Sequence, residues 1–230
     1  MKKLMTLALV CVLCVQANAQ MVLSGFEDPT GDSTTTTNVG FATALDFTAT
    51  GTELGYDVSF VDTRGTGEIG PLAGTEGGDD VGVFSNVVRS GANSFQVEDS
   101  DGLISVVFDA FDVSSFTSGF TLSGWWNAAN TGFESTDTAR IFYNLDGAGE
   151  VDILNISETG LESSSGNWNE AVSGTLTGTS LVVGFSADTN AGAEIVYFDD
   201  FSVSAVPEPS TYALIGLGLG ALYVFRRRSK

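Results

Sequence analysis

The chain contains no histidine, and its two cysteines, Cys11 and Cys14, both lie near the N-terminus. Without histidine the chain lacks Ser-His-Asp and Cys-His catalytic groups, imidazole metal ligands and the usual proton shuttle of neutral pH. Beyond Cys14 there is no thiol, which excludes a disulfide, a thiolate metal site or a cysteine nucleophile from the rest of the chain.

Basic residues are also scarce. Residues 20–205 contain no lysine and three arginines, Arg64, Arg89 and Arg140, against 28 acidic residues. This charge excludes nucleic-acid binding, because phosphate contacts need a basic face. An acidic surface favours solubility and divalent cations, and solvation in a salty exterior explains most of these charges.

The first nineteen residues have the order of an export signal. Two lysines precede an apolar run over residues 4–15, and the segment ends in the small-x-small sequence Ala-Asn-Ala. Signal peptidase accepts this pattern, so we expect residues 1–19 to be removed by cleavage between Ala19 and Gln20.

The sequence between residues 20 and 205 predicts one all-β domain. The chain has 16 phenylalanines and 3 tryptophans, more apolar area than a disordered chain carries. No long 3.6-residue periodicity is present, and short β-rich runs alternate with turn residues, which indicates a two-sheet β-sandwich or a barrel. The run over residues 103–108 is apolar on both faces and is expected inside a sheet. The expected strands cover residues 21–26, 42–48, 56–61, 81–88, 94–97, 103–108, 120–126, 139–145, 151–156, 181–186 and 194–203.

Two tryptophans are candidates for glycan binding. Alternation along residues 120–126 places Trp126 on the core face of its strand and Trp125 on the more polar face. An exposed indole can stack on a pyranose ring, because it has a large flat apolar surface with a polar edge. Trp168 lies in a polar stretch and is a similar candidate. The alternative for both side chains is packing under a loop.

The two ends of the domain supply a second candidate site. Gly25, Phe26 and Glu27 lie at the end of the first expected strand, and the last expected strand contains Asp199 next to Asp200. This pairing resembles the jelly-roll folds of carbohydrate-binding modules. The resemblance implies a jelly-roll-like sandwich with a structural calcium, bound by the Gly25 carbonyl and by the carboxylates of Glu27 and Asp199.

The strand pattern around Asp199 bears on the same prediction. Residues 195, 197, 199, 201 and 203 share one face of an ideal strand, so Asp199 points inward if that face is the core. A buried unpaired carboxylate is costly, and a hard cation with oxygen ligands would remove that cost. Alternatively, Asp199 meets backbone amides or an arginine, or the opposite face is buried.

The last residues change character abruptly after residue 205. Pro207, Glu208 and Pro209 interrupt the β pattern, and an apolar stretch over residues 212–225 precedes a basic C-terminus. This order resembles the PEP-CTERM sorting signal, here residues 206–230 with a short transmembrane helix over residues 212–225. The resemblance implies processing by an exosortase after anchoring in the inner membrane, and then a location at the cell surface or outside the cell.

These patterns lead us to expect a non-catalytic exported surface or matrix protein, associated with exopolysaccharide in a biofilm. The alternative is a glycan-binding domain that uses Trp125 or Trp168. A glycan hydrolase is the least favoured reading. Adjacent carboxylates such as Asp199 and Asp200 point to opposite faces of a strand and cannot flank one glycosidic bond.

Overall fold

The computed structural model describes residues 20–27, 45–47, 53–65, 81–129 and 132–207, together with Gly218 and Arg226. Within these residues the chain forms thirteen strands and one short helix. They are β1 (Gln20–Ser24), β2 (Leu45–Phe47), β3 (Tyr56–Val61), β4 (Val81–Phe84), β5 (Ser94–Glu98), β6 (Gly102–Phe108), β7 (Phe111–Asp112), β8 (Phe120–Ala129), β9 (Thr138–Leu145), β10 (Glu150–Ser157), α1 (Glu158–Ser163), β11 (Asn169–Val172), β12 (Ser180–Thr189) and β13 (Ile195–Ala205).

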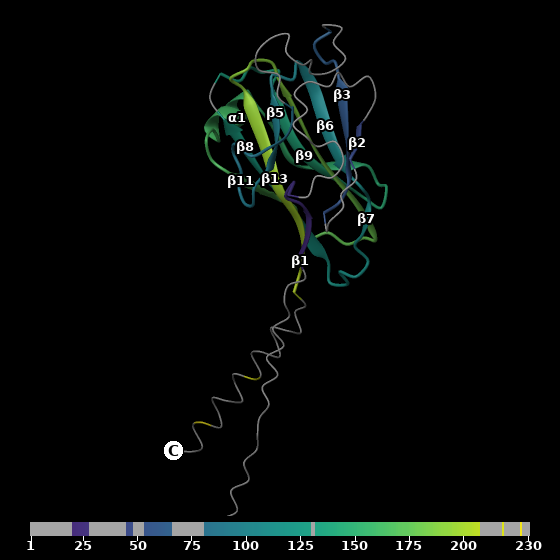
Figure 1. The fold of residues 1–230 in the computed structure, drawn as a ribbon. Coiled ribbons are helices and arrows are strands. Elements are labelled where there is room, and N and C mark those ends of the chain that lie inside the picture. Colours follow the sequence, from purple (N-terminus) through teal and green to yellow (C-terminus); the bar gives the residue numbers. More distant parts are fainter. Residues whose placement is uncertain are drawn as a thin grey trace, which may run out of the picture. The chain divides into compact units, whose positions relative to one another are not determined.

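The strands form two antiparallel sheets packed as a sandwich, which confirms the predicted fold class (Figure 1). The first sheet has the order β11-β8-β13-β5-β4, and β1 pairs with the C-terminal half of β13. The second sheet has the order β10-β9-β12-β6-β3-β2, and β7 pairs with β12. Strand β6 lies between β12 and β3, so the run over residues 103–108 is an interior strand, as predicted.

Every strand expected from the sequence overlaps an observed strand. Three elements were not foreseen: β7, β11 and α1. Strand β7 has two residues, and β11 has the sequence Asn-Glu-Ala-Val with one buried side chain, Ala171, so neither shows an apolar alternation in the sequence. The helix α1 has six residues and buries one apolar side chain, Leu161.

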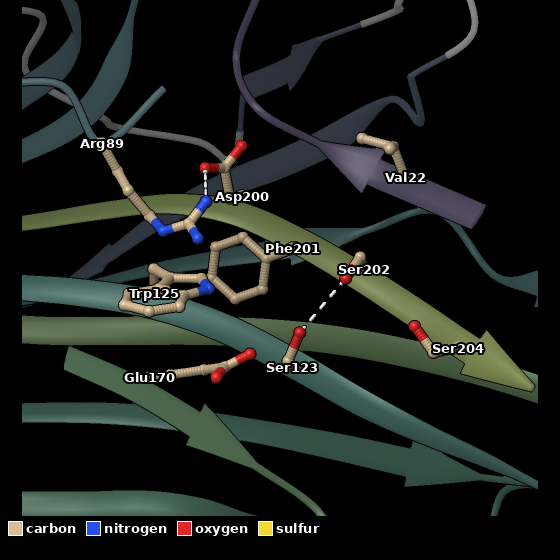
Figure 2. A pocket seen from close by; sticks show the side chains of 9 residues that line it. All are labelled: Val22, Arg89, Ser123, Trp125, Glu170, Asp200, Phe201, Ser202 and Ser204. Atoms are coloured by element: carbon tan, nitrogen blue, oxygen red, sulfur yellow. Dashed lines mark hydrogen bonds and ion pairs between the residues drawn. The ribbon is translucent and has the colours of Figure 1, made fainter. Parts of the chain in front are cut away.

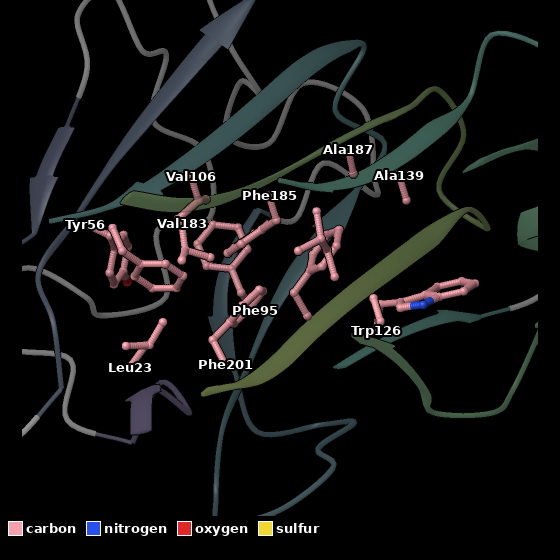
Figure 3. Packing of buried hydrophobic residues seen from close by; sticks show 14 of the residues in the cluster. Leu23, Tyr56, Phe95, Val106, Trp126, Ala139, Val183, Phe185, Ala187 and Phe201 are labelled. Atoms are coloured by element: carbon pink, nitrogen blue, oxygen red, sulfur yellow. The ribbon is translucent and has the colours of Figure 1, made fainter. Parts of the chain in front are cut away.

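The core lies between the two sheets and is rich in phenylalanine (Figure 3). Phe185 from β12 stacks on Phe198 and Phe201 from β13, with ring centroids 4.3 and 5.3 Å apart. Phe26, directly after β1, adds an edge-on ring to Phe185 and Tyr56. Such aromatic pairs stabilise beyond the area they bury, and here they join the first and last strands to the second sheet.

A β-bulge in β13 breaks the alternation expected for this strand, so the residues that face the core differ from those of an ideal strand. Val196 and Phe198 face the core before the bulge, and Phe201 and Val203 face it afterwards. The extra residue is accommodated at Asp200, which has a positive φ of 49°. Residues 195–203 therefore do not share one alternation, and Asp199 points to the outer side of the first sheet although it is fully buried.

Residues Gln20–Val206 form one compact unit. Within it, Gln20 of β1 pairs with Ser204 of β13, so the two ends of the unit are neighbours in one sheet. The predicted positions Ala19, Glu208 and Pro209 lie outside the described residues, as does the apolar stretch over residues 212–225 apart from Gly218. In the part that is described, no helix is both long enough and apolar enough to cross a bilayer.

Candidate functional site

A pocket of about 220 Å³ lies on the outer face of the first sheet, where β11, β8, β13 and β1 run side by side (Figure 2). Two aromatic rings, an arginine, two carboxylates, three serines and a valine surround it. Its lining residues are Val22, Arg89, Ser123, Trp125, Glu170, Asp200, Phe201, Ser202 and Ser204.

Trp125 forms the aromatic wall of this pocket. Strand β8 alternates as predicted, so Trp126 is 5% exposed in the core while Trp125 is half-buried on the outer face. The Arg89 guanidinium carbon lies 3.7 Å from the Trp125 ring centroid, a cation–π contact that covers one face of the indole. Glu170 of β11 is paired directly with Trp125 and reaches the pocket from the side opposite Arg89 (Figure 2).

Carboxylates of the β13 bulge fix the loop that carries Arg89. The Arg89 backbone N–H donates to Asp199 Oδ2 at 2.9 Å, and the guanidinium forms an ion pair with Asp200. The Ser90 hydroxyl donates to the Asp200 carboxylate at 2.9 Å. The bulge thus turns two adjacent carboxylates toward one loop, which an unbroken strand could not do.

Glu27 fixes the same loop from the first strand. Its carboxylate accepts the backbone N–H groups of Ala92 at 2.8 Å and Asn93 at 3.0 Å. The Gly25 N–H in turn donates to Glu53 Oε1 at 2.8 Å. The loop over Trp125 is therefore bound to carboxylates from both ends of the domain.

Of the predicted calcium ligands, Glu27 and Asp199 contact this loop, and Gly25 lies beside Glu27 and Asp200. In the structure Asp199 binds backbone amides, which is the alternative weighed from the sequence, and Glu27 does the same. A Cβ added to Gly25 would lie 3.3 Å from Asp200 Oδ1 and 3.6 Å from Glu53 Oε1. These two carboxylate oxygens do not belong to the predicted ligands, and the calcium remains a prediction.

Burial raises the pKa of Asp199 to about 7, and the neighbouring Asp200 carboxylate acts in the same direction. The hydrogen bonds from Arg89 and from Asp200 oppose this shift and do not cancel it. Part of the Asp199 population therefore holds a proton near neutral pH.

Trp168, the second predicted stacking residue, has a different environment. It is half-buried directly before β11 and is not one of the residues that line the Trp125 pocket. The structure therefore does not combine the two tryptophans into one binding surface.

A separate group of charged residues lies at the opposite end of β13. Arg64 pairs with Asp137 at 3.2 Å and with Asp188 at 2.6 Å. Ligand atoms of Glu134, Asp137 and Glu194 lie within 4.8 Å of one another, the one such group found among the described residues. Burial, followed by the Asp137 and Glu134 carboxylates, raises the pKa of Glu194 to about 7.

Sequence reasoning missed most of the residues around Trp125. Glu170 lies on β11, which was not predicted, and Arg89 lies in a loop connecting β4 and β5. One signal was available for Arg89: it is one of three basic residues in a strongly acidic domain. The serines of β13 gave no signal, because the bulge changes which residues face outward.

Comparison with known proteins identifies the C-terminal tail. The PEP-CTERM protein-sorting motif matches residues 205–228, which confirms the resemblance predicted for that segment. No curated protein matches the chain.

Several solved structures are similar to the chain. One is the carbohydrate-binding module TmCBM61 in complex with beta-1,4-galactotriose (13% identity, 64% of this chain and 86% of that chain, TM-score 0.39). Another is the family 30 carbohydrate-binding module of a cellulosomal cellulase of Clostridium thermocellum (14% identity, 66% and 92%, TM-score 0.38). A third is an adhesin domain of Lys-gingipain from Porphyromonas gingivalis (15% identity, 64% and 89%, TM-score 0.40).

Proposed function

Because the chain carries the PEP-CTERM sorting motif, which implies export and processing by an exosortase, we propose that its sandwich domain binds extracellular polysaccharide without catalysis. The domain would then act as a surface or matrix protein associated with exopolysaccharide in a biofilm. A structural calcium at Gly25, Glu27 and Asp199 belongs to the same proposal, because it would hold the loop that carries Arg89.

The observation that carries the proposal is the position of Trp125 in a pocket that is lined mostly by polar side chains, together with Val22 and Phe201. A sugar ring offers an apolar face that an indole can cover and hydroxyl groups that need hydrogen-bond partners. Glu170 supplies acceptor oxygens beside the indole, and the serines supply both donors and acceptors. Arg89 covers one ring face, so the sugar would contact the ring edge and the remaining face.

Binding is favoured over hydrolysis by the state of the pocket carboxylates. A glycosidase needs two carboxyl groups that flank one bond, and one of them must carry a proton. Asp200 forms an ion pair with Arg89 and accepts the Ser90 hydroxyl, so its carboxylate is already engaged by the loop. The only other carboxylate among the residues that line the pocket is Glu170, which leaves no second carboxyl group to flank a bound glycosidic bond.

A glycan array with the purified full chain in detergent micelles tests the proposal. We expect binding to at least one polysaccharide class, and loss of that binding in Trp125→Ala with an unchanged melting temperature. Trp168→Ala is the matched comparison. Loss of binding in Trp168→Ala alone would show that the glycan site lies outside the pocket. Release of reducing ends from a bound polysaccharide would show that the domain is a hydrolase and would contradict the proposal.

A further inference from the structure

Three serines form a shallow trough along the outer face of the first sheet. Cross-strand pairing places Val172, Ser123, Ser202 and Val22 in one row from β11 to β1. The Ser123 and Ser202 hydroxyls are 3.1 Å apart and hydrogen-bonded in the middle of the row (Figure 2). Ser204 follows on β13, so small polar side chains run along the sheet between two larger apolar ones. We name this feature the serine trough.

The flanks of the serine trough are exposed apolar side chains. Val22 is 52% exposed and Val172 is 51% exposed, among the most exposed large hydrophobic residues of the described chain. Valine at these positions presents apolar surface to solvent on both sides of a polar floor. Trp125, under Arg89, closes one end of the trough.

The trough is longer than one sugar ring. Between Trp125 and Thr121 strand β8 advances by four residues, or about 13 Å at roughly 3.3 Å per residue. A ligand that fills this length needs a repeating pattern of apolar faces and hydroxyl groups. A glycan chain has this pattern, with hydroxyls for the serines and ring faces for the valines and Trp125.

Charge selects between neutral and acidic glycans. The pocket holds one cation, Arg89, against the carboxylates of Asp200 and Glu170. Around it, the whole of residues 20–205 carries 28 acidic residues and three arginines. An anionic chain would be repelled by this field, which favours a neutral glycan over an acidic one.

We propose that the serine trough binds an internal stretch of a neutral glycan chain, with Val22 and Val172 as its contact rims. This inference rests on the proposed function and extends it from Trp125 along the three serines of the pocket to the rim residues Val22 and Val172. A second copy of the chain is a poorer occupant. Two equally acidic domains repel one another, and two isolated valines are far from the roughly 800 Å² per partner of a stable interface.

Matched valine substitutions test the inference. Val22→Glu and Val172→Glu place a carboxylate on each rim, and Val151→Glu is the control, since Val151 is 49% exposed on β10 of the other sheet. We expect about tenfold weaker binding of neutral oligosaccharides for each rim variant and unchanged binding for the control. Melting temperatures show whether each variant is folded, and Val172→Thr replaces Val172→Glu if the latter unfolds.

The probes are neutral gluco-, xylo- and galacto-oligosaccharides from di- to hexasaccharides, with oligogalacturonate as the acidic counterpart. Affinity should rise with length beyond the disaccharide, and oligogalacturonate should not bind. The inference is overturned if the rim variants bind as the wild type does, if affinity is independent of length, or if the acidic chain binds more tightly. In each of those cases the proposed function still stands if glycan binding is lost in Trp125→Ala. Failure of the wild type to bind any glycan removes both, and concentration-dependent dimerisation lost in the rim variants would assign the trough to a second copy.

Discussion

Trp125 of β8 and Asp199 of β13 are directly opposite one another in the antiparallel ladder. The indole forms the pocket wall, and the carboxylate accepts the backbone N–H of Arg89, whose guanidinium lies on that indole. The sequence offered these residues as members of two separate sites. The structure shows that two of the residues predicted to bind calcium, Glu27 and Asp199, fix the loop that covers the residue predicted to bind glycan.

Replacing Gly91 with alanine should loosen this loop. Gly91 has a φ of +68°, and a Cβ there would overlap the Glu27 carboxylate that accepts the Ala92 and Asn93 N–H groups. The carboxylate would have to move away from both amides. We expect a destabilisation of about 2–3 kcal/mol, from backbone strain together with lost charge-assisted hydrogen bonds, measured by urea unfolding.

Gly65→Ala separates these two causes. Gly65 has a nearly identical φ of +71°, but a Cβ there would meet no atom within 4 Å. Its substitution should cost about 1 kcal/mol, the strain alone. Equal losses in the two variants would show that the Glu27 contact contributes nothing.

The stability of the domain should fall as the pH rises from 5 to 8. The pKa of Asp199 is raised to about 7 by burial and by Asp200, above the value of about 3.9 for an unfolded aspartate. Between these values the folded state holds a proton that the unfolded state has released. The stabilisation is therefore complete below the unfolded pKa and is lost as the pH passes through about 7. Glu194, whose pKa is also raised to about 7, acts in the same direction.

Variants that cannot ionise provide the check. Melting temperatures of Asp199→Asn and Glu194→Gln, recorded with chelator present, should depend less on pH than those of the wild type. The chelator is needed because a bound cation would keep Asp199 ionised. Glu158→Gln, in the exposed first turn of α1, is the control and should keep the wild-type slope. A wild-type melting temperature that rises between pH 5 and 8 would contradict the prediction.

Removal of divalent cations should lower the melting temperature if calcium binds at the first and last strands. Glu27→Gln and Asp199→Ala should each abolish the difference between calcium and chelator. Glu134→Gln changes the other group of carboxylates, at the far end of β13, and should leave the difference intact. Identical melting curves of the wild type in both conditions would remove calcium from the proposal.

Most strands could be predicted from the sequence because their apolar residues alternate within a single register. Strand β8 shows this well: its alternation correctly placed Trp126 in the core and Trp125 on the outer face. The assignment needed only local information, since each side chain follows from its place in one uninterrupted strand.

The candidate site depended on information that alternation does not contain. The bulge at Asp199 and Asp200 changes which residues of β13 face the core. Its positive φ is adopted by Asp200 and not by a glycine, so the sequence gives no sign of it. The contact between Arg89 and Trp125 joins a loop to a distant strand, and β11, which carries Glu170, buries only an alanine and so has no apolar alternation in its sequence. Long-range pairing and backbone irregularity therefore set the limit of the sequence prediction.

The fit between the bulge and the opposite strand gives a final prediction. Gly124 of β8 lies on the core face, and a Cβ added there would be 2.6 Å from Cε1 of Phe201, the first core residue after the bulge. The Phe201 ring cannot move freely, because it stacks on Phe185 at 5.3 Å. Gly124→Ala should therefore destabilise the domain by about 1–3 kcal/mol through overpacking, and lower its melting temperature by several degrees.

Gly174→Ala, where a Cβ would meet no atom within 4 Å, is the control and should be close to neutral. Trp125 follows Gly124 on the opposite face of β8. A Gly124→Ala variant that keeps its stability but loses glycan binding would therefore contradict the overpacking. It would show that strand β8 shifts, and Trp125 with it, while the Phe201 ring stays in place.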